Sequence, residues 1–150
     1  MAKHFLSVVA YVVATFAVQA TSHFLINTGH YAGVTYMRKD PIFALGILSM
    51  LIEGSVLSYL YSALPKSPNW LADGMKFGWL IGAFAVGYIG LAEAAKYQVP
   101  SIGSWVLVES LNAFAQFTIY GVLVGFIQRP LASATGEVSP APSNSRTASD

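Results

Sequence analysis

The chain has 150 residues, of which 55% are hydrophobic and only 10% are charged, and its net charge is +1. Soluble domains carry about 25% charged residues, and disordered chains combine low hydrophobicity with high charge, so neither class fits most of this sequence. The small net charge argues against a nucleic-acid partner. The absence of cysteine excludes disulfides, thiolate metal sites and cysteine catalysis. The composition indicates an integral membrane protein in contact with the lipid bilayer.

Four long apolar segments alternate with short stretches rich in Gly, Pro, Lys and Arg. About 20 apolar residues suffice for a helix to cross a hydrocarbon core ~30 Å thick. We predict spanning helices at residues 5–26, 42–64, 77–95 and 104–127. Short connections favour antiparallel neighbours. The expected fold is therefore all-α: a four-helix transmembrane bundle of up-down-up-down topology, formed by a single domain over residues 1–127.

The first segment has two interpretations. Lys3, the apolar run after it and the small-residue site at 18–20 resemble a secretory signal peptide, whose cleavage would leave three spans. The apolar run continues through residues 24–26, which favours a retained helix. Gln19 and His23 are four residues apart and share one face of this helix. A lone helical histidine is more often hydrogen-bonded within the fold than bound to a metal.

The second segment carries a glutamate at its centre. Asp40 and Pro41 supply an N-cap and a first helical residue just before it. Glu53 then falls near the bilayer midplane, where an ionised group costs about 3 kcal/mol, so it is a candidate functional residue. The alternative is a protonated glutamate that hydrogen-bonds another helix. The preceding loop, residues 27–41, carries Arg38 and Lys39 and would cover this side of the bundle or anchor it at the interface.

Small residues mark the third and fourth segments. In lipid, helices associate through close contact, so glycines indicate helix–helix interfaces. The predicted packing residues are Gly78, Gly82, Gly87, Gly90, Gly121 and Gly125. We expect them to pack the bundle internally; the alternative is a seam between two copies in a homo-oligomer.

Polar residues gather toward one side of the predicted bundle. Glu109, Asn112 and Gln116 lie on one face of the fourth segment. Alternating topology places the ends of segments one and three beside the starts of segments two and four. We predict a polar funnel that runs from that surface to the midplane, the opposite half being almost purely apolar apart from Ser and Thr. Its candidate residues, for a proton or another cation, are His23, Glu93, Glu109, Gln19, Asn112, Gln116 and Glu53.

The final segment, residues 128–150, differs from the rest of the chain. It holds three prolines and five serines and no aromatic residue, so it cannot bury enough apolar surface to fold. We predict a disordered tail. The basic residues near the segment ends slightly favour one side, which predicts that both termini face the cytoplasm.

Three classes of function are consistent with the sequence. The first is binding or transport of a proton, cation or small solute at Glu53 and its neighbours. The second is a non-catalytic accessory protein that acts through helix contacts. The third, a membrane enzyme or cofactor protein that uses His23 with the glutamates, is weakened by the absence of Walker, GxSxG, GxGxxG, Glu-x-x-His and His-Glu-x-x-His motifs. No particular cofactor or metal is indicated.

The second half of the chain carries a resemblance. It resembles a loosely defined group of uncharacterised small bacterial four-span membrane proteins. The resemblance lies in the segment Trp70–Gly78, in Val99-Pro100 and in the closing Gly125-Phe126-Ile127. In that group a similar Gly-x-basic-Phe-Gly motif precedes the third span. The resemblance implies a four-helix fold and no established activity. Small multidrug-resistance transporters also have four spans and an essential membrane glutamate. Theirs lies in the first span, where this chain has none, so their function is not carried over.

Overall fold

The computed structural model describes residues 1–38 and 40–130, and these residues form helices and no strands. The predicted all-α fold is confirmed. Two of the helices contain π-helical segments, labelled η. The elements in chain order are α1 (Ala2–Thr21), η1 (Ser22–Ile26), α2 (Thr28–Ala32), α3 (Phe43–Ala63), α4 (Trp70–Ala85), η2 (Val86–Ala92), α5 (Glu93–Lys96) and α6 (Ile102–Gln128).

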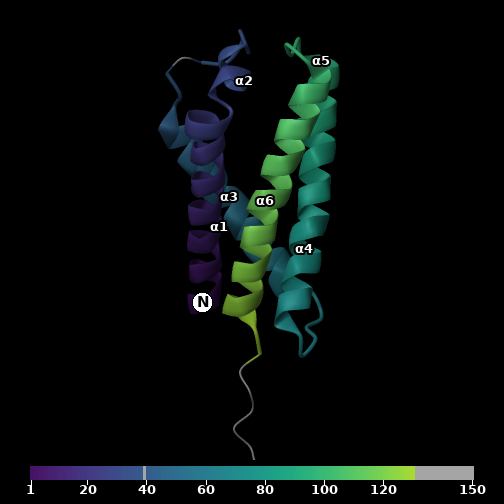
Figure 1. Ribbon diagram of the computed structural model, residues 1–150. Coiled ribbons are helices and arrows are strands. Elements are labelled where there is room, and N and C mark those ends of the chain that lie inside the picture. The colour runs from purple at the N-terminus through teal and green to yellow at the C-terminus, as the bar shows by residue number, and fades with distance from the viewer. Residues whose placement is uncertain (39, 131–150) are drawn as a thin grey trace, which may run out of the picture.

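Within the described residues, four continuous helical stretches are long and apolar enough to cross a membrane. They run over Ala2–Ile26, Phe43–Ala63, Trp70–Lys96 and Ile102–Gln128. At 1.5 Å per residue each measures roughly 30–40 Å, which matches the hydrocarbon core of a bilayer. The chain is therefore a multi-pass membrane protein. Figure 1 shows the alternating up-and-down course, with the N-terminus and the end of α6 at one end and α2 and α5 at the other.

The third spanning helix begins at Trp70, well before the predicted start at residue 77. Asn69 caps it, because the Asn69 side-chain oxygen accepts a hydrogen bond from the Ala72 backbone N–H at 3.1 Å. Asp73 lies in the first turn, where the positive end of the helix dipole favours an acidic group. Asp73 and Lys76 depress the local hydropathy, so the sequence prediction assigned this polar first turn to a loop.

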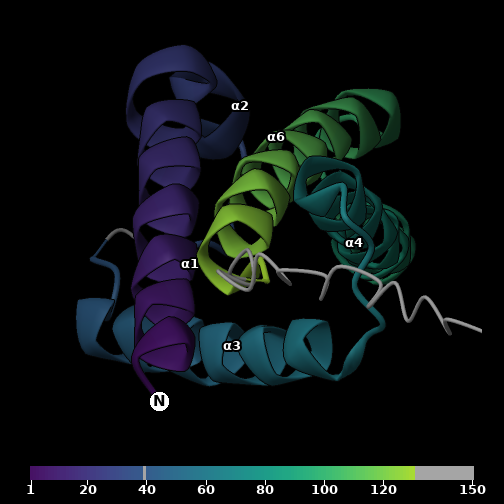
Figure 2. The same ribbon diagram turned by 90° about the horizontal axis from the view of Figure 1, so that it is seen from below.

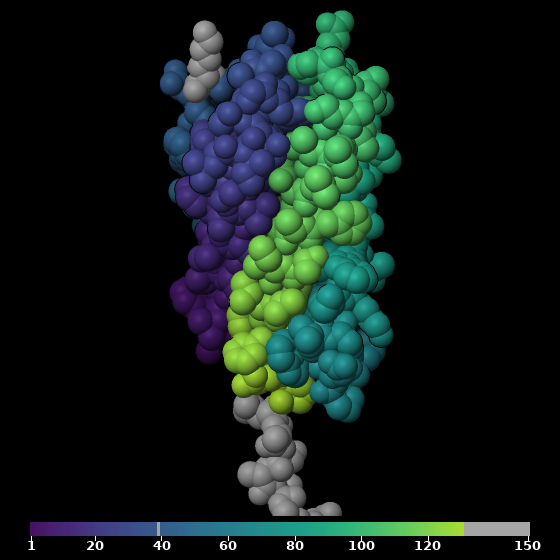
Figure 3. Space-filling model, viewed as in Figure 1, coloured from purple at the N-terminus to yellow at the C-terminus, as the bar shows by residue number. Residues whose placement is uncertain are grey.

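The four helices do not contact one another equally. The main contacts join α4 with α6, α6 with α1, and α1 with α3, whereas α3 and α4 meet mainly through the rings of Tyr61 and Phe77, whose centroids lie 5.1 Å apart. Figure 3 shows α1, α6 and α4 side by side across one face. In Figure 2, α3 runs obliquely along the other face of this layer. The side of the bundle between α3 and α4 is therefore unsealed beyond the Tyr61–Phe77 contact.

Glycines create the closest helix contact, between α4 and α6. Gly74 and Gly78 face Gly121 and Gly125 across this seam, and a Cβ atom on Gly78 would overlap the backbone carbonyl of Phe117. Such backbone proximity is typical of small-residue packing in membranes. These glycines are covered within the chain, so this seam offers no free surface for a second copy.

The other predicted packing glycines differ among themselves. Gly82 lies against the ring of Phe114, and Gly90 is in ordinary contact with Ser110. Gly87, in contrast, faces open space, with nothing within 4 Å of the position of a Cβ atom. Gly87 therefore does not take part in a contact between helices and lies on an exposed side of η2.

A second polar cluster lies at the end of the bundle near the N-terminus. The Gln128 side-chain amide donates to Ser7 Oγ at 3.1 Å and to Ser58 Oγ at 3.1 Å. His4 Nδ1 is hydrogen-bonded to the same Ser58 hydroxyl at 2.9 Å. This half was expected to be almost purely apolar apart from Ser and Thr, and Gln128 adds an amide to it because Gln128 belongs to α6 and not to the predicted tail. The remainder of that tail, residues 131–150, lies outside the described residues.

Candidate functional site

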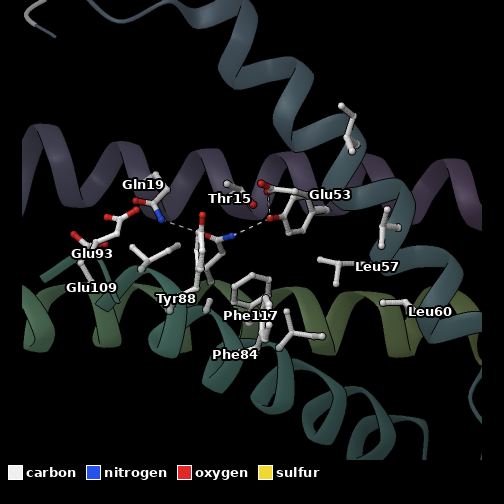
Figure 4. Close-up of a pocket in the computed structure, with 18 residues that line it drawn as sticks. Thr15, Gln19, Glu53, Leu57, Leu60, Phe84, Tyr88, Glu93, Glu109 and Phe117 are labelled. Atoms are coloured by element: carbon white, nitrogen blue, oxygen red, sulfur yellow. Dashed lines mark hydrogen bonds between the residues drawn. The ribbon is translucent and has the colours of Figure 1, made fainter. Parts of the chain in front are cut away.

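A groove of about 810 Å³ lies between α1, α3, α6 and the helix formed by α4 and η2 (Figure 4). Its walls are largely apolar, with Leu57, Leu60, Phe84 and Phe117 among the lining residues. Six polar side chains also line it: Thr15, Gln19, Glu53, Glu93, Glu109 and Gln116. Five of these are residues that the sequence analysis selected, so their helix faces converge on one cavity.

Glu53 lies at the middle of α3 and is exposed to the groove. Its carboxylate accepts two hydrogen bonds, from the Tyr11 hydroxyl at 2.6 Å and from Ser49 Oγ at 2.9 Å. Gln116 Nε2 donates to the Tyr11 hydroxyl at 3.4 Å, and Gln19 Nε2 donates to Gln116 Oε1 at 3.0 Å. A continuous chain of hydrogen bonds therefore joins α3, α1 and α6 at the centre of the bundle.

Tyr11 connects this network and was not selected from the sequence. It lies within an apolar stretch of α1 and is only 2% exposed. An aromatic residue in such a helix is usually part of the apolar core. The feature that sets Tyr11 apart from an ordinary core residue is its hydroxyl group, because a buried hydroxyl needs a hydrogen-bond partner.

A second network lies closer to the end of the bundle that carries α2. The Tyr31 hydroxyl donates to Glu109 Oε1 at 2.9 Å and accepts from Asn112 Nδ2 at 3.1 Å. Asn112 also donates to Ser22 Oγ at 2.6 Å. Ser22 opens the π-helical turn, in which its carbonyl accepts from the Asn27 N–H at 2.8 Å. Single π turns frequently occur at functional sites, since they redirect side chains.

Tyr31 keeps Glu109 hydrogen-bonded. Burial, and to a lesser degree the negative charge of Glu109, raises the pKa of the Tyr31 phenol above its ordinary value of 10.0. The phenol therefore holds its proton at neutral pH and remains a donor to the carboxylate. Asn112 is buried beside it but does not line the groove.

His23 is placed outside the groove. Its ring stacks on the ring of Tyr31, with centroids 3.7 Å apart and planes 9° from parallel. Its Nδ1 donates to the backbone carbonyl of Gln19 at 3.0 Å. Glu93, by contrast, lines the groove near Glu109 (Figure 4). The histidine thus supports Tyr31, while the two glutamates face the cavity.

Thr15 contributes its side chain to the wall of the groove and is 9% exposed. Its Oγ1 is enclosed by protein and lies beside the Tyr11 hydroxyl, so a molecule in the groove does not reach this oxygen.

The charged side chains that line the groove are all acidic. Three carboxylates line it, and no Lys, Arg or His of the described chain does. The same residues contain no group of three or more His, Asp and Glu that is arranged to hold a metal ion. Lys96 lies outside the lining, where its ammonium is 5.7 Å from the centre of the Tyr88 ring and balances part of the charge of Glu93.

Tyr31→Phe is expected to lower the free energy of unfolding by about 1–2 kcal/mol, because it leaves the buried Glu109 carboxylate without this donor and removes one of the two hydrogen bonds of the Asn112 amide. Thermal unfolding in detergent measures the effect. Tyr36→Phe is the matched control, since Tyr36 is 46% exposed and its ring packs on Tyr97. Equal stability of the two variants would contradict a structural role for the Tyr31 hydroxyl.

Comparisons with protein-family models, with curated proteins and with solved structures found no match. The helices establish an integral membrane protein. The more specific inferences on function come from the geometry and charge of the groove.

Proposed function

We propose that this protein binds a small organic cation in the groove between its helices. The observation that carries the proposal is a cavity of about 810 Å³ lined by three carboxylates and no basic side chain. Small-molecule sites typically measure about 300–1,000 Å³ and combine apolar walls with a few polar groups. The groove has both properties.

The lining favours an organic cation over an inorganic one. Glu53, Glu93 and Glu109 supply negative charge in a region of low dielectric constant, where attraction to a cation is stronger than in water. Phe84 and Phe117 supply aromatic rings, whose faces attract organic cations. A metal ion requires several oxygen ligands at one point, and no such cluster exists among the described residues.

The hydrogen-bond networks serve this site as well as helix packing. Glu53 is oriented by Tyr11 and Ser49, and Glu109 is oriented by Tyr31. Packing alone would bury these carboxylates between helices, whereas Glu53 is exposed to the cavity. This exposure favours the binding interpretation over a purely accessory role.

The test compares two probes of nearly identical shape and opposite charge, tetraphenylphosphonium and tetraphenylborate. Each is titrated into the protein in lipid nanodiscs, and empty nanodiscs correct for partition into lipid. We expect the cation to bind at least about tenfold more tightly than the anion, since attraction worth 1.4 kcal/mol changes affinity tenfold. Equal binding of both ions, or no binding above empty nanodiscs, would overturn the proposal.

A further inference from the structure

The groove opens sideways, along the unsealed side of the bundle. α3 and α4 are joined by the buried rings of Tyr61 and Phe77, and beyond this contact no helix closes the space between them. The residues at the two rims of this opening are apolar and exposed: Val56 by 52%, Leu60 by 44%, Phe84 by 75% and Tyr88 by 60%. All four lie within membrane-spanning helices, where an exposed side chain meets lipid acyl chains.

The end of the bundle near α2 and α5 is covered instead. The rings of Tyr36 and Tyr97 lie 5.2 Å apart between the connecting segments at this end. Below them, the His30 ring lies 5.6 Å from the ring of Trp105, and Tyr31 covers Glu109. Aromatic side chains thus lie over the route from the aqueous phase to the carboxylates.

From these two observations we infer that the ligand reaches the groove from the bilayer, through the slit between α3 and α4. The inference rests on the proposed function and specifies its ligand class. The ligand is an amphiphile: its cationic group lies against Glu53, Glu93 and Glu109, and its apolar part extends between Leu60 and Phe84 toward the lipid. A hydrated inorganic cation does not take this route, because its charge would have to cross hydrocarbon.

The absence of cysteine makes the route testable. The double variant Val56→Cys/Phe84→Cys places one thiol on each rim, and a bifunctional thiol reagent then bridges α3 to α4. The variant Tyr36→Cys/Tyr97→Cys is bridged in the same way across the covered end and is the matched control. Each double variant before bridging is its own reference for the rate of tetraphenylphosphonium binding in nanodiscs.

We expect the α3–α4 bridge to slow binding at least about tenfold, and the bridge at the covered end to change the rate by less than about twofold. The reverse pattern, or no effect of either bridge, would overturn lateral access. If neither the unmodified protein nor the unbridged variants bind the cation, the proposed function, on which this inference depends, is overturned instead.

A chain-length series tests the ligand class. Tetramethylammonium and decyltrimethylammonium compete for bound tetraphenylphosphonium in the same nanodiscs, with the aqueous probe concentrations corrected for lipid partition. Each methylene group buried between the rims should improve competition about fourfold. Tetramethylammonium that competes as well as the longer amphiphile would contradict the assignment.

Discussion

Glu53→Gln is expected to weaken tetraphenylphosphonium binding by about tenfold to a hundredfold, because it removes the charge nearest the centre of the groove. Glutamine keeps the shape of the side chain, and its oxygen still accepts the hydrogen bond that Tyr11 donates at 2.6 Å in the wild-type protein. The fold should therefore be retained. Titration of the probe into nanodiscs measures the affinity, and thermal unfolding verifies that the variant is folded.

A matched control lies on the same helix. Ser55 is exposed on α3, lies outside this groove and donates to the backbone carbonyl of Leu51. Ser55→Ala should leave the affinity for the cation unchanged. A Glu53→Gln variant that is folded and binds as tightly as the Ser55→Ala variant would remove Glu53 from the site.

Gly78→Ala is expected to lower the free energy of unfolding by about 3 kcal/mol, at the upper end of the range for overpacked contacts. A single added methyl group would overlap the Phe117 backbone carbonyl in α6, and backbone atoms yield less readily than flexible side chains. The seam between α4 and α6 would have to separate. Thermal unfolding in a mild detergent measures the loss.

Gly87→Ala provides the comparison for this prediction. The added methyl group meets nothing within 4 Å, and alanine is the better helix former by about 1 kcal/mol. We therefore expect unchanged or slightly raised stability. If Gly78→Ala and Gly87→Ala unfold at the same temperature, the close α4–α6 contact does not hold the bundle together.

Hydropathy was sufficient to predict the spanning helices, because a segment that crosses lipid must be apolar over its whole length. Their ends were predicted less well. The polar first turn that contains Asp73 and Lys76 belongs to α4, and the short helix α2 lies within a segment predicted as a loop. Both depend on local capping and tertiary contact, which hydropathy does not report.

The polar faces were predicted from helical spacing, which places Gln19, Glu109 and Gln116 on definite sides of their helices. Spacing does not give the angle at which helices cross. α3 and α4 meet mainly through Tyr61 and Phe77, so the polar side chains line a groove between the helices. The cytoplasmic location of both termini stays a prediction, although the N-terminus and the end of α6 lie on the same side.

The missed residues share a physical cause. Tyr11, Ser49 and Tyr31 act through hydroxyl groups, and each hydroxyl is carried by a residue that is common in apolar helices or interface loops. Only their hydrogen bonds to carboxylates distinguish them. The bonds from Tyr11 and Tyr31 join residues far apart in the sequence, so no local pattern encodes them, whereas Ser49 lies four residues before Glu53 and helical spacing places both on one face.

The most direct test of cation binding by the groove is the carboxyl carbon resonance of each glutamate in ¹³C-glutamate-labelled protein. Glu53→Gln, Glu93→Gln and Glu109→Gln assign the three resonances by deletion. Addition of tetraphenylphosphonium should shift these resonances, and tetraphenylborate at the same concentration should not. Three resonances that stay unchanged at saturating cation would contradict binding at these carboxylates.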